Sequence, residues 1–239
     1  MNSPAAHARY LSYVMRHRWF MFVECCKLGI PLRGLVHDLS KFLPSEWFPY
    51  VDFFHGQGAA LRNAKAKRDS TGYYKPTDTG HQGFDFAWLL HQKRNDHHWQ
   101  WWCLPEDEGG LKVLPMSSEA RREMLADWRG AGRAQGRPDT RAWYLANWWK
   151  LKLHDRTRAW VEFKLGGPLV SWTEDTLNDC WELRVLGRRV GMILKHEIET
   201  AVHPHALLAV FVEKQLHGLP DTLLQIAIDK YPVPLPVHP

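Results

Sequence analysis

The residues best suited to chemistry in this sequence are an adjacent histidine and aspartate, His37 and Asp38. Together they offer an imidazole nitrogen and a carboxylate oxygen. This donor pair suits Mn, Fe, Co or Zn, whereas Mg²⁺ prefers an all-oxygen shell. Neighbouring side chains on a helix point about 100° apart. Both side chains can therefore reach one metal ion only where the end of a helix abuts the site.

Further histidines are candidates to complete such a site. His17 should face inward, because apolar side chains surround it at helical spacing, and an unpaired imidazole there would be costly. His7, ten residues earlier on the same expected helix, is the alternative. Three more imidazoles fall within eight residues, and we expect at least two of them to bind metal. These three residues are His91, His97 and His98.

Two carboxylates follow on a later expected helix. Glu123 and Asp127 are four positions apart, so they share one helical face. Asp127 is the expected metal ligand; in the alternative, Glu123 binds the metal and Asp127 supports the ligands from behind. The site should hold one or two divalent transition-metal ions, either Mn, Fe, Co or Zn. The expected metal ligands are His17, His37, Asp38, His91, His97, His98 and Asp127.

Catalysis also needs groups that meet the substrate. Lys41 follows Asp38 by three positions and shares its helical face, so a phosphate contact and an ion pair with Asp38 are equally open. Asn95 is expected to orient the phosphate or an imidazole that lies behind the metal ligands. The expected catalytic residues are Lys41, Asp38 and Asn95. The cations expected to bind the substrate are Arg33, Lys93 and Arg94.

The elements that must position these residues show mainly helical periodicity. Gly29 and Pro31 end the first pattern, and Pro44 ends the second. Ser117 or Ser118 is a suitable N-cap for the segment that carries the two carboxylates. The expected helices before the boundary described below cover residues 5–28, 31–42, 45–54, 84–102, 117–128 and 140–165.

Two regions differ from this pattern. Residues 55–83 are polar and basic, and a segment of that length is expected to be a lid, with a solvated surface insertion as the equal alternative. Residues 166–168, Gly-Gly-Pro, are the strongest boundary signal. Beyond them, residues 181–194 suggest a short hairpin, and residues 204–216 and 221–230 suggest helices. We therefore expect an all-α catalytic domain over residues 1–165 and a small α or α+β appendage over residues 166–239.

Composition narrows the class of protein. The 239 residues are 45% hydrophobic and 24% charged, which is typical of a globular protein. The net charge of +5 favours an anionic partner, although the cations are dispersed, so nucleic acid is less favoured than a small molecule. No apolar run has the length of a membrane span, and no secretion signal is evident. The four cysteines form no metal or disulfide pattern, so a cytoplasmic location is expected.

The order of these candidates resembles the HD phosphohydrolase superfamily. The match is closer to one branch, an uncharacterised phage and bacterial domain with the hallmark HDLSKF followed by a histidine block. The resemblance covers roughly residues 5–165. It implies an all-helical HD-type bundle, a first metal on His17, His37, Asp38 and Asp127, and a second metal on the extra histidines. The motifs that carry the resemblance are His17-Arg18-Trp19, residues 37–42, His91…Asn95-Asp96-His97-His98, Glu123-Met124…Asp127-Trp128 and residues 153–162.

This resemblance implies a metal-dependent phosphohydrolase that acts on a phosphoester, with a nucleotide as the favoured substrate. If the chain is phage-encoded, it would work in the host cytoplasm. Two alternatives from other classes remain. One is a di-iron oxygenase, because some HD-fold proteins with histidine-rich sites activate O₂. The other is a binding module for nucleic acid or protein, in which the metal only stabilises the fold.

Overall fold

The computed structural model describes residues 2–57, 59, 79–218 and 221–232, and the expected lid lies largely outside these residues. The chain divides into two compact units, Met1–Thr157 and Arg158–Pro239. The boundary falls inside a helix, whereas Gly166 and Gly167 lie in the turn that follows this helix.

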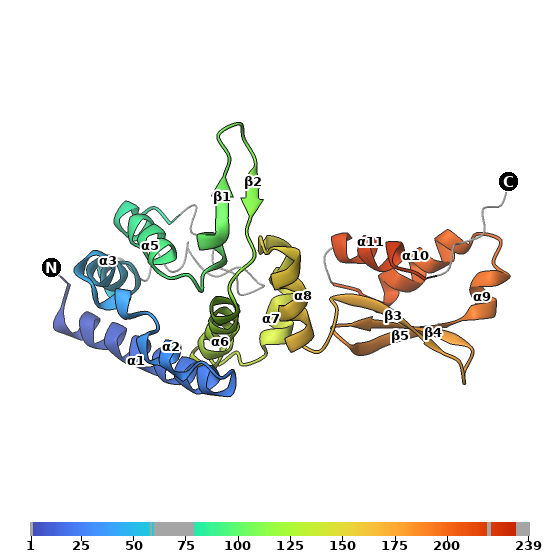
Figure 1. The fold of residues 1–239 in the computed structure, drawn as a ribbon, viewed down its shortest axis with the longest axis horizontal. Coiled ribbons are helices and arrows are strands. Elements are labelled where there is room, and N and C mark those ends of the chain that lie inside the picture. The colour runs from blue at the N-terminus through green and yellow to red at the C-terminus, as the bar shows by residue number, and fades with distance from the viewer. Residues whose placement is uncertain (1, 58, 60–78, 219–220, 233–239) are drawn as a thin grey trace. The chain divides into compact units, whose positions relative to one another are not determined.

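The first unit is built mainly from helices (Figure 1). The longest helix, α1, packs against α6, α2 and α3, and α3 packs against α5. A two-stranded antiparallel hairpin, β1–β2, extends away from the helices of this unit (Figure 1). The elements are α1 (Pro4–Lys27), α2 (Pro31–Val36), the 3₁₀ turn η1 (Leu39–Phe42), α3 (Pro44–His55), α5 (Gln82–Arg94), η3 (Trp99–Trp102), β1 (Cys103–Pro105), β2 (Leu111–Val113), α6 (Ser118–Ala134), α7 (Thr140–Asn147), η4 (Trp148–Lys150) and the start of α8 (Asp155–Lys164).

Helix α1 shows how local sequence places one site residue. Ser3 caps its first turn by accepting a hydrogen bond from the backbone N–H of Ala6 at 3.2 Å. The buried stripe then continues at helical spacing, and His17 occupies a position in this stripe where an apolar residue would be expected. The helix ends before Gly29, whose φ of +73° favours glycine. The buried stripe is Ala6, Tyr10, Val14, His17 and Met21.

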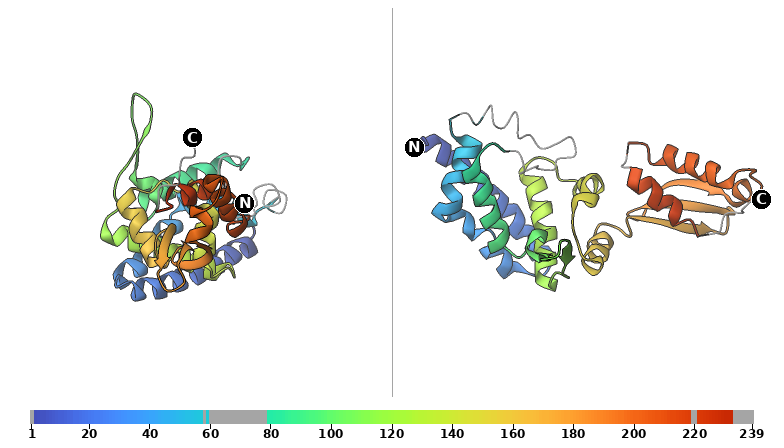
Figure 2. Two further views of the ribbon diagram at one scale, coloured as in Figure 1. Left: turned by 90° about the vertical axis from the view of Figure 1, so that its right-hand side faces the viewer. Right: turned by 90° about the horizontal axis from the view of Figure 1, so that it is seen from above.

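The second unit contains a three-stranded antiparallel sheet in the order β3-β4-β5. Helices α10 and α11 lie on one face of this sheet (Figures 1 and 2). The Trp172 side chain on β3 faces these helices, and its indole N–H donates to the Ala227 carbonyl at 2.8 Å. The elements are β3 (Val170–Asp175), β4 (Cys180–Val185), β5 (Arg188–Leu194), α9 (Lys195–Glu199), α10 (Pro204–Gln215) and α11 (Asp221–Asp229).

The expected all-α class is therefore wrong for this chain. The described residues are 61% helical but form two antiparallel sheets, which makes the fold α+β. The hairpin of β4 and β5 matches the expected one, but β3 and the β1–β2 pair were not expected. The strands of β1–β2 span only three residues each, too few for alternation of apolar and polar residues to be recognised.

Three expected helices also have different ends. The helix expected over 84–102 ends at Arg94, after which the histidine block is a turn. The helix expected over 117–128 continues to Ala134. The helix expected over 140–165 is interrupted between Lys150 and Asp155. The most consequential difference concerns the helix expected over 31–42, because its interruption creates the candidate site.

Candidate metal centre

The His37-Asp38 pair lies at a break in the chain rather than within a helix. Helix α2 ends at Val36, His37 is extended, and Asp38 adopts the left-handed conformation with φ +55° and ψ +25°. A non-glycine residue in this region is uncommon and costs conformational energy. Arg18 on α1 holds the break in place, because its guanidinium donates to the carbonyl of His37 and, at 2.7 Å, to that of Leu35. The break turns both members of the pair inward, and each is about 98% buried or more.

Four side chains meet around one point, and we call them the first ligand group: His17, His37, Asp38 and Asp127. His17 Nε2 lies 3.2 Å from Asp127 Oδ1 and 3.3 Å from His37 Nε2. Asp38 Oδ2 lies 3.3 Å from His37 Nε2 and 3.5 Å from His17 Nε2. Ligands bound tetrahedrally at about 2.0–2.1 Å from a zinc ion lie about 3.3–3.4 Å apart. The spacing of these four atoms therefore fits a metal ion.

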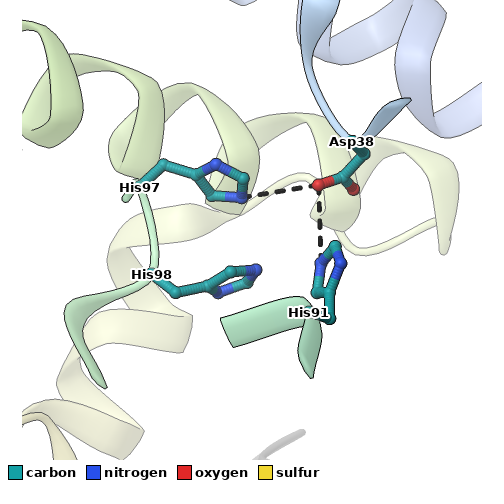
Figure 3. Close-up of side chains that lie close together, drawn as sticks. All are labelled: Asp38, His91, His97 and His98. Atoms are coloured by element: carbon teal, nitrogen blue, oxygen red, sulfur yellow. Dashed lines mark ion pairs between the residues drawn. The ribbon is translucent and has the colours of Figure 1, made fainter. Parts of the chain in front are cut away.

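A second ligand group shares Asp38 with the first and adds the three clustered histidines His91, His97 and His98 (Figure 3). Asp38 Oδ1, the oxygen that the first group does not use, lies 3.4 Å from His91 Nε2 and 3.6 Å from His97 Nε2. One ligand atom from each of the four residues lies within 4.8 Å of the others. The carboxylate of Asp38 thus presents one oxygen to each group.

Several of these atoms are buried without a hydrogen-bond partner among the residues that the structure describes. They are His17 Nδ1, Asp38 Oδ1, His97 Nε2 and His98 Nε2. Buried polar atoms of native proteins are nearly always satisfied, so a group of orphaned nitrogen and oxygen atoms needs a partner. Three of the four belong to the second ligand group and carry lone pairs that a cation would satisfy. This observation supports a metal ion there independently of the distances.

A further layer of residues holds the ligand imidazoles by their Nδ1 atoms. Glu123 Oε1 accepts from His37 Nδ1 at 2.9 Å, and Arg33 donates to the other oxygen of Glu123. Glu46 on α3 accepts from His91 Nδ1 at 2.9 Å and from Arg94 at 2.7 Å. Such contacts fix the orientation of a ligand ring and leave its other nitrogen free to bind a metal.

These positions bear on the two alternatives for ligands. Asp127 contacts the Nε2 atoms of the first ligand group, whereas Glu123 lies on the Nδ1 side of His37. This geometry favours Asp127 as the ligand of the first group, although Glu123, His37 and His97 form a third group whose atoms lie close enough to hold an ion. His7 belongs to none of the groups of possible ligands, and its Nδ1 accepts from the indole of Trp47 at 2.9 Å.

The pKa values of the carboxyl groups in this centre are set by burial and by the neighbouring charges. Burial by itself raises the pKa of Asp38, but the charges of His37 and Lys41 outweigh it and hold this pKa well below the usual range. Burial likewise raises the pKa of Glu123, but hydrogen bonds from His37 and His97 bring it down to about 2. Both side chains are therefore anionic, as a cation site requires.

The imidazoles differ in protonation. Burial lowers the pKa of His98 well below its ordinary value, and the adjacent His97 and His91 lower it further. Burial also lowers the pKa of His91. For His37, burial lowers the pKa, but the charge of Asp38 and hydrogen bonds to the surrounding carboxylates raise it well above its ordinary value. His91 and His98 are thus held in the neutral form that binds metals.

The cations expected to bind substrate have a different role. Arg33 donates to Glu123 and Asp96, and Arg94 donates to Glu46 and Ser45, so both neutralise carboxylates. Lys93 is exposed, and none of the three lines the cavity beside the centre. Arg33 and Arg94 thus supply countercharge to buried carboxylates behind the ligands. Substrate binding by the three cations stays a prediction.

The two other expected catalytic residues lie close to the ligands. Asn95 Nδ2 donates to Ser40 Oγ at 2.9 Å and to the His91 carbonyl at 2.7 Å, so it positions the chain near His91 and does not line the cavity. Lys41 Nζ lies 2.6 Å from Asp38 Oδ2 and also lines the cavity. Lys41 therefore makes the ion pair and still borders the space where a substrate would bind.

The cavity has a volume of about 1040 Å³ and reaches ligands of both groups, including His17, Asp38 and His91. Three arginines in its lining make no ion pair with any described residue. They were not among the cations expected to bind substrate. Arg9 and Arg16 lie seven positions apart on α1, and Arg16 precedes His17 directly. This spacing places both arginines on the helical face near His17, so the sequence could have indicated them. The three are Arg9, Arg16 and Arg137.

Residues 6–166 match a sequence family described as "Family of unknown function (DUF5662)", and the chain belongs to this family. The matched region contains every member of both ligand groups, while almost all of the second unit's sheet and helices lie beyond it. No curated protein and no solved structure matches the chain. Within the described parts of the chain, no helix combines the length and apolar character needed to cross a membrane.

Proposed function

We propose that the protein is a metal-dependent phosphohydrolase whose centre binds two transition-metal ions that share Asp38. The observation that carries this proposal is the carboxylate of Asp38, with Oδ2 in the first ligand group and Oδ1 in the second. A histidine, a His-Asp pair and a later aspartate in this arrangement also agree with the resemblance to the HD superfamily. The nitrogen-rich donor set favours Mn, Fe, Co or Zn over Mg.

A bound metal pair would supply a nucleophile at neutral pH, by lowering the pKa of a water molecule, and would polarise the phosphoryl oxygens. The chain's own residues complete the site. Lys41 extends into the cavity next to Asp38, where its ammonium can offset the negative charge that develops on the phosphoryl group. Arg9, Arg16 and Arg137 make the rest of the cavity attractive to an anion.

The lining of the cavity supports a nucleotide as the phosphoester. Four tryptophans border it, and two of them, Trp128 and Trp143, have ring centroids 5.1 Å apart. A cavity lined by both indole rings and guanidinium groups suits a molecule that combines a flat aromatic base with a phosphate. The remaining two tryptophans are Trp88 and Trp99. The four cysteines are free, which fits a cytoplasmic location.

The test is metal analysis of full-length protein purified without chelator, followed by measurement of phosphate release. Protein loaded with Mn²⁺, Co²⁺, Fe²⁺ or Zn²⁺ is given nucleoside mono-, di- and triphosphates, with glycerol phosphate as a phosphoester that lacks a base. We expect metal-dependent release from at least one nucleotide. No release from any phosphoester by protein that contains two ions would refute the hydrolase.

A di-iron oxygenase is the second candidate, and the histidine-rich donor set favours it. Five of the seven ligand residues are histidines and two are aspartates, a composition that also suits redox-active iron. Consumption of O₂ by iron-loaded protein with a polyol or a phosphonate, without phosphate release from phosphoesters, would establish this candidate instead. A binding module with a structural metal is less favoured, because structural zinc sites use four ligands and leave no open position.

A further inference from the structure

Glu123 contacts both ligand groups through a single oxygen atom. Its Oε1 lies 2.9 Å from His37 Nδ1 and 3.3 Å from His97 Nδ1. His37 belongs to the first ligand group and His97 to the second. The two rings lie close together, with centroids 4.4 Å apart. One buried carboxylate oxygen therefore faces an imidazole from each of the two candidate ion sites.

The position of this oxygen is fixed from behind. Arg33 donates to Oε2 of Glu123 and, through another nitrogen, to Asp96. Glu123 lies one helical turn before Asp127 on α6 and is 4% exposed. The carboxylate is thus held by its helix, by one nitrogen of a guanidinium that also binds Asp96, and by the two rings. It has little freedom to follow one ring without affecting the other.

We propose that Glu123 is a positioning residue that couples the two ion sites. This inference rests on the proposed two-metal centre. A carboxylate that accepts from Nδ1 fixes the tautomer and the ring plane of a ligand histidine, with Nε2 directed at the metal. When the first ion orients His37, it also fixes the shared oxygen of Glu123, and this oxygen in turn orients His97 for the second ion. By linkage, binding of either ion favours the other to the same extent.

Glu46 provides a matched control within the same centre. It is also a buried carboxylate, with an arginine on one oxygen and a ligand imidazole on the other. Among the described residues, the only ligand histidine that it contacts is His91, which belongs to the second ligand group alone. Replacement of Glu46 should therefore weaken one ion, whereas replacement of Glu123 should weaken both.

The experiment is a chelator competition on full-length protein loaded with Zn²⁺, in which the ions released are counted as free zinc falls. Wild-type protein should release two ions over a narrow range. In Glu123→Gln, both ions should leave at free zinc concentrations raised by about 10- to 100-fold, the usual effect of losing such a partner. In Glu46→Gln, one ion should be released early, while the other keeps the affinity that it has in wild-type protein when its partner ion is absent.

The outcomes separate the coupling from the two-metal centre. Two ions in wild type, with only one of them weakened in Glu123→Gln, would overturn the coupling and leave the centre intact. Fewer than two ions in wild type would overturn both. Because Glu123→Gln also removes one of the two anionic partners of Arg33, Glu123→Asp serves as a second variant that keeps the charge but withdraws the oxygen. Circular dichroism of each loaded variant verifies folding, and unaltered release of both ions from Glu123→Asp and Glu123→Gln would refute the proposal.

Discussion

Replacement of Asp38 by asparagine should remove both metal ions from the protein. Asp38 Oδ2 lies within 3.5 Å of two nitrogens of the first ligand group, and Oδ1 lies 3.4 Å and 3.6 Å from two nitrogens of the second. Asparagine has nearly the same shape and also tolerates the left-handed backbone found here. The substitution therefore removes the negative charge with little change in the backbone.

The expected magnitude follows from the number of ligands. A structural zinc ion with four ligands is bound with about 10–16 kcal/mol, or about 2.5–4 kcal/mol for each ligand. Loss of one ligand therefore lowers the affinity by about 10²- to 10³-fold, and here both ions lose the same ligand. The fold should tolerate the change. Lys41 loses its partner, at a cost of about 3 kcal/mol or less, because its ammonium borders the cavity and can be hydrated.

The assay measures zinc content at a buffered free zinc concentration about tenfold above the wild-type dissociation constant. Wild-type sites are then about 90% occupied, and a site weakened 100-fold is about 10% occupied. Asp127→Asn is the control, because Asp127 contacts only the first ligand group and should lose one ion. Retention of both ions by Asp38→Asn, or loss of only one, would refute the shared-carboxylate geometry.

Three further predictions concern residues around the centre. Lys41→Met should lower kcat/KM for phosphate release by about 10²-fold with both ions retained, and a loss of ions instead would show that Lys41 serves only to hold Asp38. Arg16→Gln should raise KM for an anionic substrate about tenfold without changing metal content, and an unchanged KM would remove this arginine from the site. In Gly130→Ala the new Cβ would lie 2.9 Å from the Met21 backbone, so α1 and α6 would have to separate. Urea unfolding should therefore show a free energy of unfolding lower by about 1–3 kcal/mol, and wild-type stability would contradict this packing.

The helices that supply the ligands could be predicted from local signals. The stripe of α1 repeats at helical spacing and ends at Gly29, and Ser117 caps α6 as its hydroxyl suggested. These patterns depend on residues close together in sequence, which is why the sequence reveals them. The strand β3 was not predicted because its pairing with β4 depends on contacts that no local pattern encodes.

The candidate site could also be predicted only in part from the sequence. The seven expected ligands do come together, because residue type and the order of the motifs restrict which side chains can bind a metal. The contacts of the cations expected to bind substrate could not be predicted from residue type and motif order. Arg33 and Arg94 are close to the motifs in sequence, yet they pair with Glu123 and Glu46, two carboxylates that only the tertiary structure brings near them. The break in the helix at Asp38 could not be predicted either. A non-glycine residue rarely adopts the left-handed backbone conformation, and surrounding contacts must maintain it here.

The most direct test of the two-metal centre is anomalous X-ray diffraction from crystals of the full-length protein grown with Zn²⁺ or Mn²⁺. The proposed centre predicts two anomalous peaks, one at each oxygen of Asp38. The first should be enclosed by His17, His37 and Asp127, and the second by the histidines of the second ligand group. A single peak, no peak, or peaks away from Asp38 would contradict the central claim.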